Sequence, residues 1–366
     1  ISRRESLALL AAPLLAQPKI SVLHRSTVFS FPITDPYDAA NRYGFSHAPN
    51  ICTLPDGRLL AVWFCGPFEG AVNQVILGAY SADDGQTWSR GEVMQDFPRQ
   101  SDFDPSLLVS GTRTHLFLIA CRWNRYPFVH GEKNFVGKES YRIFHRVSDD
   151  SGRTWSEPTT VQPEPAFCTR GNGIRHSSGT LLVPIYQMSG DHACVLKSTD
   201  DGRTWKRAGR VTCPMGTEEP VIAELRSGAV MMILRTRDGY LWRAISTDRG
   251  ETWAASTKTD IVAARASHSI LRTRDGRLVL THDECPPPNR TPLTVRVSND
   301  DGESWSAPFT LTDVPVPKPG DKVWGRQVTY PSATELRDGT LGVVWADLSM
   351  ADDSQAGEIR FARVKI

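Results

Sequence analysis

The chain has 366 residues, and its 42 basic residues balance 41 acidic ones. This balance excludes a global field that would draw the protein onto nucleic acid or an anionic membrane, so any anion binding must be local. Ten tryptophans and 28 glycines, with prolines spread along the chain, favour many short strands joined by tight turns.

The first segment has the order of a signal peptide. Residues 2–6 carry two adjacent arginines, the apolar stretch Leu7–Leu15 follows, and Ala16-Gln17-Pro18 begins with a small residue. The apolar stretch is too short to span a bilayer. The arginine pair resembles a twin-arginine export signal, a plain secretory signal fits nearly as well, and an ordinary N-terminal helix is the structural alternative. We expect residues 1–17 to be a signal peptide, residues 18–366 to form the fold, and the protein to be secreted or periplasmic.

One eight-residue motif, Ser-x-Asp-x-Gly-x-Thr/Ser-Trp, recurs along the chain. Its copies begin at Ser81, Ser148, Ser198, Ser246 and Ser298. Each copy follows a strand-like run, such as Leu293–Val297, whose apolar and polar residues alternate. The aspartate can accept hydrogen bonds from turn N–H groups, the glycine can take a positive φ, and the tryptophan can pack beneath the turn. The motif therefore predicts a structural clasp between two strands rather than a ligand site.

A second series of turns indicates the number of blades. Asp-Gly or Ser-Gly pairs, which are hairpin signals, begin at positions 56, 110, 178, 227, 275 and 338. These hairpins and the octets, about fifty residues apart in the later repeats, match four-stranded blades around an axis. We predict an all-β, six-bladed β-propeller. The last repeat lacks an octet, and residues 358–364 are expected to form a strand that closes the ring with an early one.

Seven cysteines are scattered along the chain, without a Cys-x-x-Cys pair or the spacing of zinc ligands. Cys52, Cys65 and Cys121 lie within or beside apolar strand-like runs, so we expect them to be buried as small hydrophobic residues. The sequence predicts neither a metal centre nor a cofactor.

Octets of this kind are Asp boxes, and the chain resembles the sialidase (neuraminidase) superfamily over nearly all of residues 18–366. Asp-box propellers also include lyases, other glycosidases and non-catalytic proteins, so the site residues must support the functional assignment. The resemblance implies three arginines that bind the substrate carboxylate, a tyrosine nucleophile assisted by a glutamate, and an aspartate that works as acid and base.

The fourth and the closing repeats carry the resemblance to the reacting residues. Glu218-Glu219-Pro220 precedes a strand-like run, a Ser-Gly turn and a second run that ends in Arg235. This order resembles the sialidase segment with the glutamate and the second arginine. The spacing from Tyr330 to Asp338-Gly339 resembles that of the nucleophile segment. The resemblance therefore implies that Tyr330 is the nucleophile, Glu219 its base and Arg235 a carboxylate anchor.

The third arginine is assigned to Arg290, because Asn289-Arg290-Thr291 before the fifth octet resembles the corresponding sialidase segment. The motif is short, and three other arginines are rivals for the place: Arg265, Arg296 and Arg326. Of these, Arg265 and Arg326 are kept as candidate substrate-binding residues.

The first repeat departs from the family. Where sialidases have Arg-Ile-Pro, this chain has His47-Ala48-Pro49, so one arginine is missing. Glu69 lies near the place of the acid/base aspartate and could protonate the leaving oxygen, provided that burial raises its pKa. Asp102 and Asp104 lie near a predicted strand end, where polar residues often line a central pocket. We take Asp102 as a candidate to bind a substrate amine or hydroxyl.

His47 leaves several functions open. As a donor it could replace the missing arginine, and as a base it could act on a uronate or on a sugar linked to glucuronic acid; a structural histidine is the third option. The first hypothesis is an exo-acting, retaining glycoside hydrolase that removes a terminal anionic sugar such as sialic acid from a glycan. The second is a uronate-directed glycosidase or polysaccharide lyase that uses His47. The third is a non-catalytic glycan-binding propeller.

Overall fold

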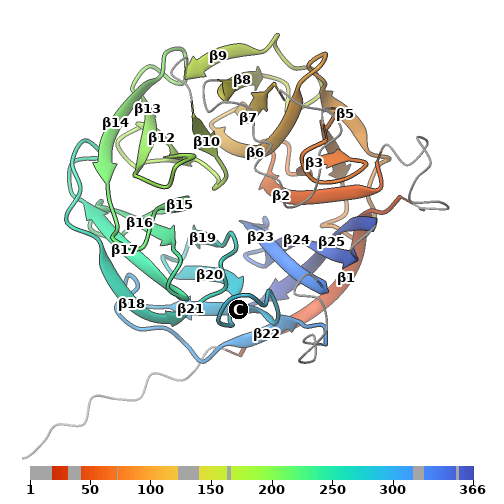
Figure 1. Cartoon of the computed structure of the whole chain (residues 1–366). Helices are drawn as coiled ribbons and strands as arrows, with labels where there is room; N and C mark the ends of the chain where they lie inside the picture. The colour runs from red at the N-terminus through yellow and green to blue at the C-terminus, as the bar shows by residue number, and fades with distance from the viewer. Residues whose placement is uncertain are drawn as a thin grey trace, which may run out of the picture.

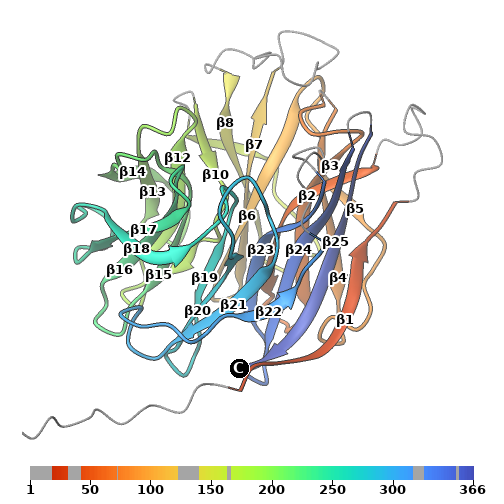
Figure 2. The ribbon, with the colours of Figure 1, turned by 60° about the horizontal axis from the view of Figure 1, so that its bottom comes forward.

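The computed structural model describes residues 19–31, 43–71, 73–122, 140–162, 166–315, 325–351 and 354–366. The expected signal peptide, residues 1–17, lies outside this part of the chain. The described residues form six antiparallel sheets arranged around a central axis (Figure 1), and Figure 2 shows the sheets standing side by side around it. The prediction of an all-β, six-bladed propeller is confirmed.

Blades 1 to 5 are each built from strands that follow one another in the chain, with the first strand nearest the axis (Figure 1). Blade 1 contains β2 (Phe45–Thr53), β3 (Leu59–Gly66), β4 (Val75–Ser81) and β5 (Glu92–Gln95). Blade 2 contains β6 (Ser101–Ser110), β7 (Arg113–Cys121), β8 (Arg142–Ser148) and β9 (Thr159–Gln162). Blade 3 contains β10 (Phe167–Thr169), β11 (Ile174–Arg175), β12 (Leu181–Gln187), β13 (Ala193–Ser198) and β14 (Lys206–Val211). Blade 4 contains β15 (Glu218–Glu224), β16 (Val230–Arg235), β17 (Tyr240–Ser246) and β18 (Thr257–Val262). Blade 5 contains β19 (Ser269–Arg272), β20 (Leu278–Asp283), β21 (Leu293–Ser298) and β22 (Phe309–Thr312).

Blade 6 joins the two ends of the described chain. It contains β23 (Arg326–Glu335), β24 (Leu341–Ala351) and β25 (Ser354–Lys365), and its outermost strand is β1 (Ser21–Phe29). The pairing of β1 with β25 runs antiparallel from Ser21 opposite Lys365 to Phe29 opposite Ile359. The expectation that a terminal strand closes the ring with an early one is therefore confirmed.

Each octet forms the turn between the last two strands of blades 1 to 5. In the first copy, Asp83 Oδ1 accepts hydrogen bonds from Ser81 Oγ at 2.8 Å and Thr87 N at 2.9 Å, and Gly85 has a φ of 83°. The same bonds recur in the other copies. Blade 6 needs no octet, because its third and fourth strands come from opposite ends of the chain.

The apolar cores lie between neighbouring blades. Strand β3, with the sequence LLAVWFCG, is buried along its whole length because both of its faces are covered. All seven cysteines are buried and form no disulfide, which confirms the prediction for Cys52, Cys65 and Cys121. Over the ranges given above, no helix has the length and apolar character needed to cross a membrane.

Candidate functional site

A cavity of about 460 Å³ lies where the innermost strands begin, a volume typical of small-molecule pockets. Blades 1 to 4 and blade 6 contribute to its lining, together with the connection between blades 4 and 5. The lining side chains include His47 and Glu69 of blade 1, Asp104 of blade 2, Tyr186 of blade 3, Glu219 of blade 4 and Tyr330 of blade 6.

Four innermost strands bulge at a residue that precedes proline. The bulged residues are Ala48, Asp104, Glu219 and Tyr330, with φ of 52°, 48°, 41° and 58°. The pairing register shifts at each of them. Proline lacks the N–H needed for the ladder, and a bulge re-aims side chains that would otherwise alternate between faces. Positive φ in a non-glycine residue is strained, and such strain gathers at functional sites. The bulges place three of these side chains in the cavity lining.

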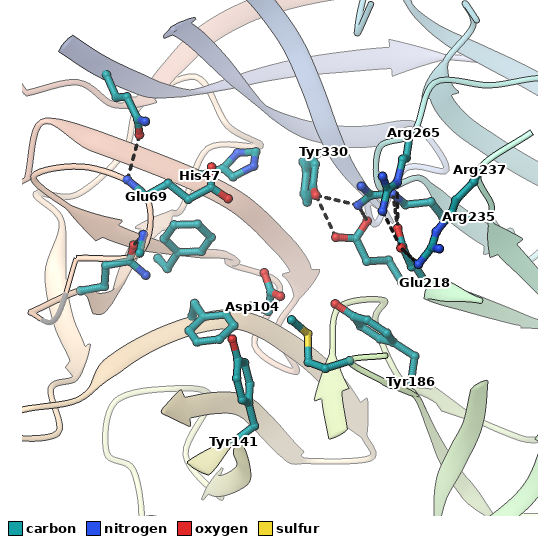
Figure 3. Close-up of a pocket in the computed structure, with 17 residues that line it drawn as sticks. His47, Glu69, Asp104, Tyr141, Tyr186, Glu218, Arg235, Arg237, Arg265 and Tyr330 are labelled. Carbon is teal, nitrogen blue, oxygen red and sulfur yellow. Dashed lines mark hydrogen bonds and ion pairs between the residues drawn. The ribbon is translucent and has the colours of Figure 1, made fainter. Parts of the chain in front are cut away.

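Tyr330, Glu219 and Arg235 form a connected group in the cavity. Figure 3 labels Tyr330 and Arg235. Tyr330 Oη donates to Glu219 Oε1 at 2.8 Å, and Arg235 Nη1 donates to Tyr330 Oη at 2.9 Å. Arg235 Nη1 also forms an ion pair with Glu219 Oε2. All three residues are buried. The structure thus brings together the three residues that the sequence assigns as nucleophile, base and anchor.

The charges in this group follow from its burial. Burial raises the pKa of Tyr330 well above its ordinary value, although the charge of Arg235 acts against this. Burial alone would lower the pKa of Arg235, but the negative charges of Glu219 and Glu218 raise it. The group therefore contains a neutral phenol held between a guanidinium and a carboxylate.

His47 lies beside the phenol, with ring centroids 4.2 Å apart. It is 3% exposed. Burial and then the positive charges of Arg290 and Arg170 lower the pKa of His47 well below its ordinary value. A neutral imidazole cannot supply the charge of the missing arginine, so His47 can act here only as a neutral donor or acceptor.

Arg170, which the sequence analysis did not select, belongs to a polar layer across the axis. Its Nη2 donates to the carbonyl oxygens of Pro49 at 3.3 Å and Tyr330 at 3.2 Å, and Asn50 Nδ2 donates to its carbonyl oxygen at 2.9 Å. This layer ties blades 1, 3 and 6 together. A separate hollow, lined by later residues of the same strands such as Ile51 and Ala333, lies beyond it. The burial of Arg170 that reveals this role is seen only in the structure.

Two carboxyl groups on other walls of the cavity differ in exposure. Glu69, in the connection between β3 and β4, is exposed, and its backbone N–H donates to Gln355 Oε1 at 2.9 Å. Asp104 is 8% exposed. Burial, with the nearby charge of Glu219, raises the pKa of Asp104 to about 8. The sequence analysis expected burial to raise the pKa of Glu69. In the structure Glu69 is exposed, and the buried carboxyl group with a raised pKa is that of Asp104. The Asp-Pro pair, parallel to Glu219-Pro220, is the signal that could have singled it out.

The opposite wall carries three arginines around one carboxylate (Figure 3). Arg265 Nη2 donates to Glu218 Oε1 at 2.8 Å and its Nε donates to Oε2 at 3.3 Å. Arg237 Nη2 donates to Glu218 Oε1 at 3.3 Å, and Arg235 Nε lies 3.3 Å from Oε2. Arg265 thus lines the cavity as the sequence analysis expects, whereas Arg237 and Glu218 were not selected there.

Three other candidates do not line the cavity. Arg290 lies against Tyr330, with its guanidinium carbon 5.5 Å from the ring centroid. Asp102 is buried and accepts a hydrogen bond from Phe97 N at 2.8 Å. Arg326 forms an ion pair with Asp347 at 3.0 Å and is more than half exposed. Asp102 and Arg326 are therefore positioned for structural contacts. Within the described ranges, no group of three or more His, Cys, Asp or Glu side chains is arranged to hold a metal ion.

Comparison with known proteins decides the family. The model of the BNR repeat-like domain matches residues 57–343. The chain belongs to the BNR repeat-like domain family. The resemblance to sialidases that the sequence analysis stated is confirmed.

Curated relatives of this BNR repeat-like protein are sialidases. The sialidase of Micromonospora viridifaciens is 27% identical over 391 residues, which cover 94% of this chain and 58% of that protein. The sialidase of Bacteroides fragilis is 26% identical, with 87% of this chain and 61% of that protein covered. The chain thus spans about three fifths of the length of these relatives.

Solved structures share the propeller of this BNR repeat-like protein. Trypanosoma rangeli sialidase in complex with sialic acid has a TM-score of 0.70 and 20% identity, covering 94% of this chain and 59% of that one. A protein of unknown function from Dyadobacter fermentans has a TM-score of 0.73 and 17% identity, covering 95% and 99% of the two chains. At these identities the likeness shows a common fold.

Proposed function

We propose that this BNR repeat-like protein is an exo-acting, retaining glycoside hydrolase of the sialidase type, which removes a terminal anionic sugar such as sialic acid from a glycan. The observation that carries the proposal is the Tyr330 hydroxyl, held between Glu219 at 2.8 Å and Arg235 at 2.9 Å on the cavity wall. The relatives named sialidases support the same class of reaction.

In the proposed reaction the Tyr330 oxygen attacks the anomeric carbon while Glu219 accepts its proton. The bond to the leaving oxygen breaks, and a carboxylic acid protonates that oxygen. Water then attacks the anomeric carbon and gives a proton back to the carboxylate that had acted as the acid, the glycosyl–tyrosine bond breaks, and the phenolate recovers its proton from Glu219. Because the carboxylate of sialic acid is attached to the reacting carbon, a neutral phenol approaches without the repulsion that a carboxylate nucleophile would meet. The scheme uses one nucleophile and two groups that accept and return protons. Attack by the nucleophile and then by water retains the configuration at the anomeric carbon.

The proton donor of this scheme is one of two carboxyl groups. The sequence resemblance assigns it to Glu69, which is exposed. Asp104 is the stronger candidate, because it lines the cavity, is buried, and has a pKa raised to about 8. At neutral pH it therefore holds the proton that the leaving oxygen needs.

Arg235 and Arg290 are the proposed anchors for the substrate carboxylate, because a guanidinium can bind a carboxylate through two parallel hydrogen bonds. Arg235 is fixed by Glu219, and Arg290 lies against the Tyr330 ring. His47, neutral and beside Tyr330, would contact the sugar as a hydrogen-bond partner.

Hydrolysis of a fluorogenic aryl α-sialoside tests the proposal. The parent protein should release the fluorophore, and Tyr330→Phe should lower kcat on the order of 10³-fold, because the nucleophile is removed with little change in shape. The matched control is Tyr80→Phe, whose hydroxyl donates to Gly152 O at 2.6 Å in an outer turn and should leave turnover unchanged. Turnover by Tyr330→Phe at the parent rate would remove Tyr330 from the nucleophile role.

A second candidate function is supported by His47. Its Nδ1 is buried and has no hydrogen-bond partner among the described residues, so the imidazole is available to a ligand. A His47-dependent glycosidase or lyase acting on a uronate would use it as a base. Absorbance from an unsaturated uronate product, lost in His47→Gln, would support this alternative. Glycan binding without any turnover, retained when Glu219→Gln and Tyr330→Phe are combined, would indicate a non-catalytic propeller instead.

A further inference from the structure

Two arginines lie on the outer part of the cavity wall, nearer to solvent than the proposed reacting group. Tyr330 and Arg235 are buried, whereas the side chains of Arg237 and Arg265 are 52% and 48% exposed. All four residues line the cavity. A terminal sugar bound against Tyr330 would therefore lie deeper than the two outer arginines, and the next sugar of the same glycan would lie closer to them.

A single carboxylate holds both outer arginines. Arg265 Nη2 donates to Glu218 Oε1 at 2.8 Å and its Nε donates to Oε2 at 3.3 Å, while Arg237 Nη2 donates to Oε1 at 3.3 Å. Glu218 reaches this wall because the pairing register of β15 shifts after it, with a φ of 41° at Glu219. The Glu218 side chain is only 14% exposed, so it fixes the two guanidinium groups from the protein side and leaves them open to the cavity.

The backbone beneath Arg237 leaves room for its guanidinium. A Cβ at Gly190 would lie 3.3 Å from Arg237 Nη2, and one at Gly216 would lie 3.4 Å from Arg237 Nε. Both glycines have positive φ, of 76° and 83°, and Thr217 N donates to Gly190 O at 3.0 Å, which joins the two loops. The guanidinium therefore rests on two glycine turns, where a larger residue would crowd it, and it is ordered before a ligand arrives.

The outer pair carries more positive charge than its partner cancels. Arg237 and Arg265 bring two positive charges and Glu218 brings one negative charge, which leaves a surplus of one positive charge. Burial opposes ionisation of Glu218, but the hydrogen bond from Arg265 and the charge of Arg235 lower its pKa, so the carboxylate stays charged and keeps hold of both arginines. Figure 3 shows the exposed Glu69 across the cavity from this pair.

Both outer arginines keep hydrogen-bond donors for a ligand. Within the described ranges, the side-chain hydrogen bonds of Arg265 use Nη2 and Nε, and that of Arg237 uses Nη2. Nη1 of each guanidinium is therefore left for an acceptor in the cavity. Guanidinium groups bind oxyanions through charge-assisted hydrogen bonds, and a surplus positive charge favours an acidic ligand over a neutral one.

We propose that Arg237 and Arg265 form a binding site for an acidic group, a sulfate or a carboxylate, on the sugar next to the terminal one. The protein would then prefer glycan ends in which the two outermost sugars are both acidic. The inference rests on the proposed function in taking a glycan end as the ligand.

The test compares sialyllactose with the same trisaccharide sulfated on its galactose, by isothermal titration calorimetry. Tyr330→Phe serves as the background, so that neither ligand is consumed. The sulfated ligand should bind on the order of tenfold more tightly, because it gains charge-assisted hydrogen bonds from both arginines. Arg237→Gln and Arg265→Gln should each lower this preference by about threefold, and should leave the affinity for sialyllactose unchanged.

A second pair of ligands distinguishes the two acids. A disialic acid should bind more tightly than its analogue in which the inner carboxylate is a methyl ester, if a carboxylate occupies the site. A preference in one pair alone assigns that acid as the ligand. The matched control is Arg153→Gln, which removes an exposed arginine paired with Asp56 at 3.2 Å on an outer turn; it should leave every ratio unchanged.

Salt provides a measurement that needs no arginine variant. The preference for the acidic member of a pair should fall several-fold between about 0.02 M and 0.5 M NaCl, because exposed charges are screened. Equal binding within both pairs, a preference that persists in the combined Arg237→Gln and Arg265→Gln variant, a preference that salt does not change, or no binding of any ligand would each overturn the inference. Turnover of the aryl α-sialoside without such a preference would leave the proposed function intact. A preference lost in Arg237→Gln, in a protein whose parent cleaves no sialoside, would keep this site and remove the proposed function.

Discussion

Asp104 and Glu69 both line the cavity, but Asp104 is buried whereas Glu69 is exposed. The pKa of Asp104 is raised to about 8 by burial and by Glu219. We expect Asp104→Asn to lower kcat/KM for a sialoside with an unactivated alcohol leaving group by about 10²–10³-fold, because such a group needs a proton from a general acid. Activity of the parent should decline as pH rises through about 8, where Asp104 loses its proton. pH–rate profiles of the parent, of Asp104→Asn and of Glu69→Gln measure both effects.

The stabilities of the parent protein and of Asp104→Asn provide an independent check on the raised pKa of Asp104. Asp104 ionises near 3.8 when unfolded and near 8 when folded, so folding takes up a proton between these values. The free energy of unfolding of the parent should therefore fall, relative to that of Asp104→Asn, as pH rises through this window. If Glu69→Gln abolished activity while Asp104→Asn kept it, the acid would be Glu69 and the resemblance would have been the better guide.

At the scale of elements, the octet turns support the blades without contacting the cavity. Asp300 Oδ1 accepts from Ser298 Oγ at 2.8 Å and from Ser304 N at 2.9 Å in the turn between β21 and β22. We expect Asp300→Ala to lower Tm by a few degrees and to leave kcat/KM unchanged, because the turn loses its acceptor while the site is untouched. Thermal unfolding with Asn299→Ala as the neighbouring control checks this. A large loss of activity at an unchanged Tm would contradict a structural role for the octet.

The elements were predictable to the extent that they repeat. The octets and hairpin pairs recur at regular spacing, so the blade number follows from the sequence, and Tyr330, Glu219 and Arg235 follow from segment order. Glu218 and Asp104 were not selected because their access to the cavity comes from bulges, which shift the alternation of side chains by one residue. The pairing of Arg237 and Arg265 with one carboxylate joins loops of two blades, and no local pattern encodes such a contact.

At the scale of the whole molecule, the ring is held closed by β1 along the edge of β25. Removal of residues 1–30 should leave β25 as a bare edge strand and lower Tm on the order of 10 °C, with increased aggregation, because an uncovered edge exposes unpaired backbone groups. Removal of residues 1–18 alone retains β1 and is the matched control. Differential scanning calorimetry with light scattering measures both effects. Identical unfolding of the two truncated proteins would show that closure contributes nothing to stability.

The polar layer of Arg170 and Asn50 separates the cavity from the hollow at the other end of the axis. A polymer therefore cannot pass through the propeller, and whatever enters the cavity must leave by the same mouth. In the proposed reaction, the released sugar would therefore leave by the mouth through which the next chain end enters. For the proposed hydrolase, dissociation of the product would then compete with the arrival of the following chain end, and free sugar that accumulates would slow the reaction.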